Sequence, residues 1–288
     1  MINFTNTKEF FNTYSGSEKK KKLNYNNEYY LVKFPDPIRE KNKNISYINN
    51  VFSEYIGSNI FKICGFDTQE TLLGLYNYKG KDKIVCACKD FLNNQNILLE
   101  FDKLALSTNP DKKIDTELND IIETINESKK ITGITDITDK FYDMFIIDAL
   151  IGNTDRHNGN WGFILNNKDN TFSFSKIYDC GSCLNPLLDD KDISLLDDNE
   201  IKNLAINCYS CIKVNNQKIN YYNYITSLKD KECNKALLRI FNNIELNKIK
   251  EFILNIECIS NIRKNFYISI IEIRYKILKN TYKKLLNK

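Results

Sequence analysis

The chain has 288 residues, of which 42% are hydrophobic and 12% aromatic, so it carries enough apolar side chains to bury a sizeable core. This composition excludes an intrinsically disordered protein. The formal net charge of +4, from 41 basic and 37 acidic residues, is too small to indicate a nucleic-acid partner. No run of eighteen apolar residues is present, so we expect no membrane span.

The first sixty-five residues predict a strand followed by a helix. Residues 28–34 are rich in β-branched and aromatic side chains, which indicates a strand. A lysine is costly to bury inside such a strand, which favours a functional role for Lys33. The alternative is that Lys33 lies on the exposed face of an edge strand. Residues 46–64 have the apolar spacing of a helix that faces a core and ends at Gly65. Glu54 lies in the middle of this helix, where periodicity alone does not exclude a solvent-facing position.

The rest of the chain predicts a hairpin and then a mainly helical part. Because no flexible linker separates the two, we expect an α+β fold with two lobes packed around a cleft. The small β-rich N-lobe takes residues 1–92 and the larger helical C-lobe takes residues 93–288. The predicted elements are a hairpin at 69–76 and 83–91, helices near 97–106, 115–129 and 137–151, strands at 161–165 and 171–178, and two long helices over 244–287.

A polar turn between a buried helix and a strand is the most informative stretch. Asp155 and Asn160 lie five residues apart in this turn, which also holds the only His (His157) and the only Trp of the chain. Asp179 ends a later apolar run and is followed by Cys-Gly. Asp and Asn are ordinary turn residues, so a lone Asp and Asn at this spacing would indicate little. Their order, with a further Asp beyond two short strands, favours a catalytic interpretation.

This arrangement is typical of a phosphoryl-transfer site. A catalytic-loop Asp accepts or orients the attacking hydroxyl group, and an Asn and a second Asp bind the metal ion that neutralises the nucleotide phosphates. Divalent cations such as Mg²⁺ prefer oxygen ligands held on a rigid loop. We therefore predict that Asp155 is the catalytic residue, that Asn160 and Asp179 bind Mg²⁺, and that ATP is the phosphoryl donor.

The remaining nucleotide contacts are assigned from the same scheme. A strand Lys that binds the phosphates and a helix Glu that pairs with it are both required in an active kinase, so we assign these roles to Lys33 and Glu54. The turn of Ser15, Gly16 and Ser17 would then cover the phosphates, although a single glycine is a weak signal for a glycine-rich loop.

We expect adenine to dock on backbone groups from Lys89 to Phe91. This prediction depends on position alone, because backbone contacts leave no side-chain signature. The stretch lies where the small sheet of the N-lobe leads into the helical part of the chain.

The nine cysteines are interpreted as reduced thiols of a cytosolic protein. Two Cys-x-x-Cys pairs, Cys180/Cys183 and Cys208/Cys211, have a spacing that would normally suggest a zinc ribbon. We favour free thiols, because Cys180 directly follows the predicted metal ligand and Cys208 lies in what reads as helix-flanking sequence. The N-terminus lacks the layout of a signal peptide.

The chain resembles the HipA-like kinases. The resemblance implies a protein-kinase-like fold and ATP- and magnesium-dependent phosphorylation of serine or threonine in a protein substrate, usually with autophosphorylation. It implies the roles given above for Lys33, Glu54, Asp155, Asn160 and Asp179, and we interpret His157 as a hydrogen-bond donor that shapes the loop. The matching stretches are residues 30–35, 52–56, 69–74, 87–91, 150–163, 178–184 and 218–222.

Two other functions stay open at this point. Asp-Arg-His-Asn-x-Asn also resembles the catalytic loop of phosphoinositide kinases, but the acidic segment after Asp179 is poorly suited to anionic lipid head groups. A pseudokinase that serves as a binding module is disfavoured, because every expected catalytic side chain is present. The resemblance further implies a bacterial toxin or effector and leaves open both a cytoplasmic location and delivery into host cells. Ser15 and Ser17 are candidate autophosphorylation sites.

Overall fold

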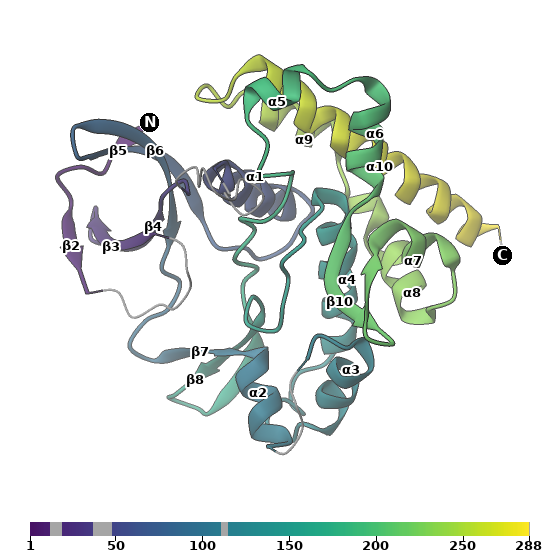
Figure 1. Ribbon diagram of the computed structural model, residues 1–288. Helices are drawn as coiled ribbons and strands as arrows, with labels where there is room; N and C mark the ends of the chain where they lie inside the picture. The colour runs from purple at the N-terminus through teal and green to yellow at the C-terminus, as the bar shows by residue number, and fades with distance from the viewer. Residues whose placement is uncertain (12–18, 37–47, 111–114, 288) are drawn as a thin grey trace.

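The N-terminal lobe is built on a six-stranded sheet, drawn on the left of Figure 1. The computed structural model describes residues 1–11, 19–36, 48–110 and 115–287. Within these ranges the strand order is β1-β5-β6-β4-β3-β2, and only β1 and β5 pair in parallel. The strands are β1 (Ile2–Asn3), β2 (Lys8–Phe10), β3 (Lys20–Tyr25), β4 (Glu28–Lys33), β5 (Thr71–Tyr78) and β6 (Lys81–Lys89).

The predicted strand and hairpin of this lobe are confirmed with small shifts of their ends. β5 and β6 are joined by the two-residue turn Lys79-Gly80, whose φ angles of 53° and 78° suit a tight hairpin. One face of the sheet buries a small core around Phe4, Leu23 and Val32. The other face receives helix α1.

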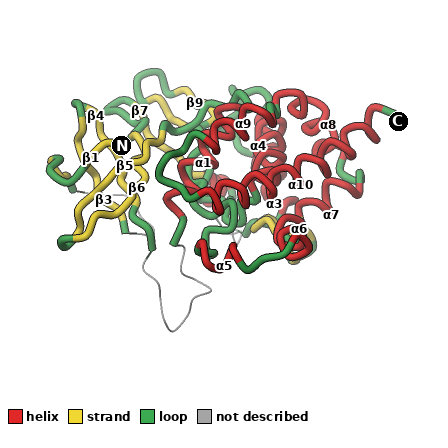
Figure 2. The backbone as a smooth tube through the Cα atoms, turned by 90° about the horizontal axis from the view of Figure 1, so that it is seen from above, coloured by secondary structure: helices red, strands yellow, loops and turns green. Residues whose placement is uncertain are grey.

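Helix α1 (Asn50–Ile63) joins the sheet to the helical lobe. Val51 packs against Cys86 and Cys88 of β6, whereas Ile56 and Ile60 belong to the large core of the helical lobe. Because its apolar side chains are shared between two cores, the helix fixes how its polar residues face the boundary between the lobes. Seen from above, strands gather on one side and helices on the other (Figure 2). The predicted α+β, two-lobed fold is confirmed.

The helical lobe is organised around α4 (Ile137–Ile151), which is buried over nearly its whole length. The long α10 (Asn261–Leu286) packs against it, and smaller helices surround the pair. Two of these begin with capping boxes, at Asp189 and Asp197, so the acidic stretch after the predicted metal ligand serves to start helices. The other helices are α2 (Phe101–Thr108), α3 (Leu118–Glu127), α5 (Asp190–Ser194), α6 (Asp198–Ile206), α7 (Tyr221–Ser227), α8 (Lys231–Ile240), the 3₁₀ turn η2 (Phe241–Asn243) and α9 (Leu246–Leu254).

A three-stranded sheet in this lobe corrects one prediction. Residues 96–100 form strand β7 (Asn96–Glu100), so the helix predicted over 97–106 begins only at Phe101. β7 pairs with β8 (Gly162–Asn166), which pairs with β9 (Thr171–Phe174). A short apolar run fits a strand or a helix equally well, and here pairing with a distant strand decided the outcome. The lobe division after residue 92 stays a prediction.

A second hairpin was missed in the sequence. Residues around Cys208 follow α6, as expected, but strand β10 (Tyr209–Val214) then pairs with β11 (Gln217–Asn220). The turn is Asn215-Asn216, with φ angles of 54° and 62°, a conformation that Asn tolerates well. This turn was the available signal, and it lies between two short apolar stretches.

Candidate active site

Lys33 contacts two carboxylates that come from other parts of the chain. Its Nζ lies 2.7 Å from Glu54 Oε2 and 2.8 Å from Asp179 Oδ1. Lys33 and Glu54 are 7% and 0% exposed, so neither faces solvent as the alternative interpretations allowed. The structure therefore brings together the predicted phosphate-binding Lys, its helix Glu and one of the two predicted metal ligands.

Two hydrogen bonds from side chains of helix α1 position the segment that follows Asp179. Glu54 Oε1 accepts a hydrogen bond of 3.1 Å from the backbone N–H of Cys180, and Ser53 Oγ donates to the carbonyl of Cys183 at 2.6 Å. A single helix turn thus fixes both the partner of Lys33 and the segment that follows Asp179. Gly57 makes this close approach possible, because a Cβ there would lie 2.7 Å from the Cβ of Cys180.

The two carboxylates that contact Lys33 have pKa values shifted in opposite directions. Complete burial raises the pKa of Glu54, and the nearby Lys33 only partly offsets this effect. The surrounding protein also opposes ionisation of Asp179, but Lys33 and Arg156 outweigh it and lower the pKa of Asp179. Asp179 keeps 39% of its side chain exposed. It is therefore an ionised, accessible oxygen donor of the kind that Mg²⁺ selects.

The predicted catalytic loop, residues 152–162, begins where α4 ends. Gly152 takes the left-handed conformation, with φ of 67°, and ends the helix. Asn153 then donates from Nδ2 to Asp148 Oδ1 at 2.9 Å and accepts from the backbone N–H of Asp155 at 3.2 Å. Tyr221 of α7 adds a hydrogen bond of 2.6 Å to the carbonyl of Asn153. These contacts hold the backbone on the N-terminal side of Asp155 and leave its side chain exposed.

A buried arginine joins this loop to the segment that carries Asp179. Arg156 forms a bidentate ion pair with Asp148, at 2.9 Å from Nε and 3.1 Å from Nη2. Its Nη1 donates to the carbonyls of Asn160, at 2.8 Å, and of Tyr178. Asp148 raises the pKa of Arg156 and outweighs the opposing effect of burial, so the guanidinium stays charged. One side chain thus sets the relative position of the two segments that carry the predicted metal ligands.

Asn160 and His157 complete the loop. Asn160 Nδ2 donates to the carbonyl of Asp155 at 2.7 Å, which orients the amide so that its oxygen is the atom available to a metal ion. His157 was interpreted as a donor, but its Nδ1 accepts a 3.0 Å hydrogen bond from the backbone N–H of Gly159. The imidazole is bonded to the loop backbone, as expected, but it accepts the hydrogen bond that it was predicted to donate.

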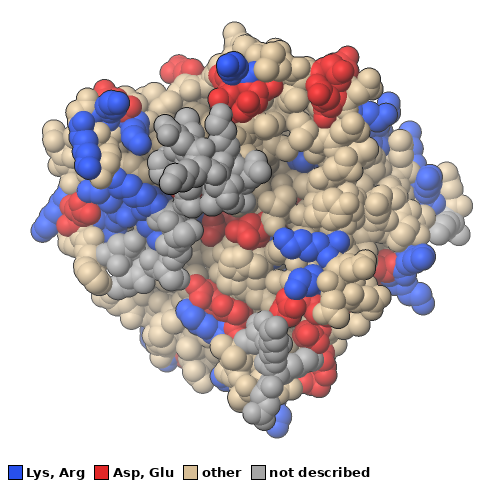
Figure 3. Space-filling view, in the orientation of Figure 1, with Lys and Arg blue, Asp and Glu red and all other residues tan. Residues whose placement is uncertain are grey.

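Partial burial raises the pKa of Asp155, and the nearby charge of Asp179 adds to this effect. His157 and Lys218 act in the other direction. The carboxylates of Asp155, the predicted catalytic residue, and Asp179, a predicted metal ligand, are therefore close enough to repel one another. In the space-filling view, acidic side chains gather in the hollow between the lobes (Figure 3).

The predicted adenine site is only partly available. The backbone N–H of Lys89 donates to the carbonyl of Glu70 at 2.8 Å, and its carbonyl accepts from Gln69 Nε2 at 3.0 Å. These backbone groups are engaged within the protein, so Phe91 is the better candidate of the two. Its ring lies 6.1 Å from that of Tyr178, next to Asp179. The predicted phosphate-covering residues Ser15, Gly16 and Ser17 lie outside the described ranges.

The cysteines show no sign of a zinc ribbon in the described part of the chain. All nine are free, and burial raises the pKa of Cys180 to about 12. No group of three or more His, Cys, Asp or Glu side chains is placed there to hold one metal ion. Mg²⁺ needs no such group, because it is commonly held by one or two carboxylates together with substrate phosphates. No helix in the described ranges is long and apolar enough to cross a membrane.

Sequence reasoning missed three residues that shape this site. Arg156 lies in the loop itself and Asp148 lies in the last turn of α4, where a single carboxylate in an otherwise apolar helix segment was the available signal. Lys218 was noted only as part of a matching stretch. Its influence on Asp155 depends on the unpredicted β10–β11 hairpin.

Together, the sheet-rich lobe, the Lys33–Glu54–Asp179 cluster and the Asp155 loop define a protein-kinase-like phosphotransferase. The family model for the HipA-like C-terminal domain matches residues 12–244. The chain belongs to this family.

Relatives of known function agree with this assignment. The serine/threonine-protein kinase CtkA of Helicobacter pylori (strain J99 / ATCC 700824) is 40% identical over 285 residues, which cover 95% of this chain and 85% of that protein. The crystal structure of the proinflammatory kinase CtkA of Helicobacter pylori superposes with a TM-score of 0.89 at 38% identity and covers 99% of this chain and 98% of its own. The prediction of a serine/threonine-protein kinase of the HipA-like type is confirmed.

A more distant protein is similar to this chain in fold alone. The structure of Fam20 from hydra, determined with a sugar, has a TM-score of 0.52 at 14% identity and covers 95% of this chain and 84% of its own. At this identity the two chains share an architecture. The similarity carries no information on substrate.

Proposed function

We propose that this kinase transfers the γ-phosphoryl group of ATP, with Mg²⁺, to a serine or threonine hydroxyl of a protein in the hollow between the lobes. The observation that carries the proposal is the contact of Lys33 with both Glu54, at 2.7 Å, and Asp179, at 2.8 Å. A buried lysine fixed between a helix glutamate and an accessible carboxylate is the arrangement that an active kinase needs.

Each side chain has a role that follows from its position. Lys33, held by Glu54, would bind nucleotide phosphate oxygens. The Asp179 carboxylate and the Asn160 amide oxygen would hold Mg²⁺, which neutralises charge on the phosphates when bound. Phe91 lies where adenine would dock, with its backbone as the expected contact. These assignments rest on the hydrogen bonds and ion pairs described above and on the chemistry of oxygen ligands.

Asp155 would accept or orient the hydroxyl proton of the substrate. Its side chain is exposed and its backbone is fixed from both sides, by Asn153 and by Asn160. Because burial raises the pKa of Asp155, the carboxylate is a better proton acceptor than an ordinary aspartate. The proton of the attacking hydroxyl would move to Asp155 as its oxygen forms the new bond to phosphorus and the bond to ADP breaks.

Autophosphorylation at Ser15 or Ser17 is a separate part of the proposal. Both residues precede β3, in the region expected to cover the phosphates. Phosphopeptide mapping of active protein tests it, with the Asp155→Asn variant as the unphosphorylated control. Active protein in which both serines stay unmodified would remove this part and leave the kinase assignment in place.

The cellular setting is also proposed. Nine free cysteines, eight of them buried, suit a reducing compartment such as the cytosol. The mild net charge of +4 supports a protein substrate over nucleic acid. Delivery into host cells stays a prediction from the family resemblance.

The main experiment is incorporation of labelled phosphate from ATP and Mg²⁺ into the purified protein and an added protein substrate. The wild type is compared with Asp155→Asn and Asp179→Ala. Loss of a positioned base or of a metal ligand should reduce the rate on the order of a thousandfold. Equal incorporation by the three proteins would show that the assigned residues do not carry the reaction.

A further inference from the structure

Residues 180–190, called here the post-Asp179 segment, join the predicted metal ligand Asp179 to the start of helix α5. In kinases that are switched by phosphorylation, the segment after the metal-binding Asp becomes ordered when a phosphate group pairs with arginine side chains. How this segment is held therefore bears on whether the kinase needs such a switch.

The catalytic loop and the end of α4 hold the first half of the segment. The backbone N–H of Leu184 donates to the carbonyl of Ile151 at 3.0 Å, and Thr154 donates to the carbonyl of Ser182 from its N–H at 3.4 Å and from Oγ1 at 3.3 Å. Leu184 and Asn185 have φ angles of 55° and 57°. Such a left-handed conformation is costly for a leucine and persists only where the surrounding contacts impose it.

Asn49, the residue before α1, holds the second half of the segment. Its backbone N–H donates to the carbonyl of Pro186 at 3.0 Å, and its Nδ2 donates to the carbonyl of Leu188 at 2.7 Å. An asparagine at this position commonly caps the helix through its side-chain oxygen. In the described residues 48–110 the side chain of Asn49 makes no such bond to α1. Its amide therefore serves the segment instead of the helix.

Arg263, near the start of α10, contacts the end of the segment. Its Nη2 donates to the same carbonyl of Leu188 at 3.0 Å, and Asp190 Oδ1 lies 2.8 Å from Nε and 2.6 Å from Nη2. Arg263 is only 3% exposed. A buried arginine paired with an anion is the contact that a phosphate group makes when it orders this part of a kinase. Here the carboxylate of Asp190 supplies the negative charge.

The residue types of the segment agree with this interpretation. Ser182 is the only residue with a hydroxyl group between Cys180 and Asp190, and the next one along the chain is Ser194. Because Asp190 is part of the sequence, its contact with Arg263 needs no second enzyme to create it.

We propose that Asn49 and Arg263 are positioning residues that hold the post-Asp179 segment, and with it Asp179, in the active arrangement, so that this kinase needs no phosphorylation of residues 180–194. The proposal rests on the kinase function proposed above and adds how that site is regulated. Asp190 takes the place of the phosphate group, and Asn49 ties the segment to the helix that carries Glu54.

The first test is amide hydrogen exchange on the Ser182→Ala/Ser194→Ala protein without ATP or Mg²⁺. This variant cannot be phosphorylated in residues 180–194. We expect the segment to exchange at least about a hundredfold more slowly than an unstructured peptide, because its backbone is already bonded. The variant should also keep the kcat of wild type. Exchange at the rate of an unstructured peptide, or loss of activity, would overturn the proposal.

The second test weakens the two contacts. Asn49→Asp removes the donor to Leu188 but keeps a residue suited to start a helix. Asp190→Asn removes the charge opposite Arg263, and Asp190→Glu should restore it. In both weakened variants the segment should exchange faster, with exchange in α4 unchanged. The Mg²⁺ concentration for half-maximal rate should rise by about tenfold, the change expected from one hydrogen bond to a charged group. This concentration does not depend on the fraction of protein that is folded.

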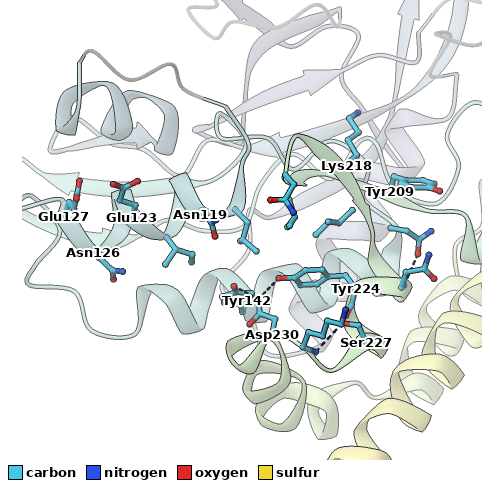
Figure 4. Close-up of a pocket in the computed structure, with 18 residues that line it drawn as sticks. Asn119, Glu123, Asn126, Glu127, Tyr142, Tyr209, Lys218, Tyr224, Ser227 and Asp230 are labelled. Carbon is cyan, nitrogen blue, oxygen red and sulfur yellow. Dashed lines mark hydrogen bonds between the residues drawn. The ribbon is translucent and has the colours of Figure 1, made fainter.

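Two controls match these substitutions. Asn119→Asp makes the same exchange in the first turn of α3, on the wall of a hollow of about 1300 Å³ whose described lining excludes residues 180–190 (Figure 4). Glu272→Gln removes a carboxylate that is 43% exposed, close to the 45% of Asp190, from an ion pair with Lys250. Both should keep the wild-type exchange and Mg²⁺ dependence.

The outcomes separate this proposal from the proposed function. If Asn49→Asp and Asp190→Asn both kept the wild-type exchange and Mg²⁺ dependence, the positioning roles would be wrong and the kinase assignment would stand. A wild type that transfers no phosphate at any Mg²⁺ concentration would overturn the proposed function and this proposal with it.

Discussion

Gly152 lies directly against the guanidinium group of Arg274, where a Cβ would fall 2.3 Å from Nη1. Its φ of 67° is also a conformation that side chains disfavour. Gly152→Ala should therefore lower the free energy of unfolding by about 3 kcal/mol or more, the sum of a left-handed alanine and an overpacked core. Chemical denaturation measures this change.

Substitutions at two other glycines separate the cost of the positive φ from the cost of the close contact. Gly80 also has a positive φ, of 78°, but a Cβ there would meet nothing within 4 Å. Gly80→Ala should cost about 1 kcal/mol, and Gly133→Ala, with neither a positive φ nor a close neighbour, should be nearly neutral. If Gly152→Ala were no more destabilising than Gly80→Ala, the close contact with Arg274 would be wrong.

The ion pair of Arg156 with Asp148 predicts a large loss of stability. Both side chains are only 1% exposed, so Arg156→Ala leaves a buried carboxylate without its counter-ion. We expect a fall in the free energy of unfolding of about 3–5 kcal/mol. Arg239→Ala, which removes a more exposed pair with Asp143, is the matched control and should cost about 0–1 kcal/mol. Similar values for the two variants would contradict the buried pair.

The pairing of Lys33 with Glu54 predicts a loss of activity rather than of fold. Glu54→Gln removes a hydrogen bond between charged groups, worth about 1.5–3 kcal/mol, so kcat/KM should fall by about 10- to 100-fold. The control is Glu9→Gln, which removes a similar pair with Lys21 at 2.6 Å near the edge of the same sheet. Steady-state kinetics at varied ATP should show an effect only in the first variant. An unaffected Glu54→Gln protein would exclude the assigned role.

The raised pKa of Asp155 predicts an acid limb in the pH–rate profile. Activity needs the ionised carboxylate, so the rate should fall as the pH drops through this pKa, above the range of an ordinary aspartate. Lys218 favours the ionised form together with His157 and Arg156, against Asp179. Lys218→Met removes a cation, so the pKa should rise further and the acid limb should move to higher pH.

Lys229→Met is the control for this shift, because Lys229, which lies between α7 and α8, is not among the principal groups that act on Asp155. Its acid limb should coincide with that of wild type. A Lys218→Met profile that coincides with the wild-type profile would show that Lys218 does not act on the catalytic carboxylate.

The catalytic chemistry could be predicted from the sequence because it constrains residue types and spacing within short stretches. Asp155, Asn160 and Asp179 were predicted in this way, and Lys33 and Glu54 were predicted from the requirement for a lysine on a strand and a glutamate on a helix. The structure places Lys33 against Glu54 and Asp179, which lie 21 and 146 residues away along the chain. Their roles stay predictions, but their proximity is a finding.

Features that depend on tertiary pairing could not be predicted. β7 reads as a helix start until its pairing with β8 is known, and the β10–β11 hairpin has an Asn-Asn turn but little alternation of apolar residues. The position of this hairpin beside α3 also depends on tertiary contacts, since the carboxylate of Glu117 accepts from the backbone N–H groups of Asn215 and Asn216. For the same reason the engaged backbone of Lys89 was not foreseen, since Glu70 and Gln69 bond to it only in the folded sheet.

Binding of ATP in the presence and absence of Mg²⁺, measured by calorimetry on four proteins, tests the central assignment most directly. Asp155→Asn should bind Mg²⁺-ATP as tightly as wild type while its transfer rate falls on the order of a thousandfold. Asp179→Asn and Asn160→Ala should lose most of the gain in affinity that Mg²⁺ gives to wild type. If both variants kept the full magnesium-dependent gain, Asp179 and Asn160 would not hold the metal ion and the account of the site would be wrong.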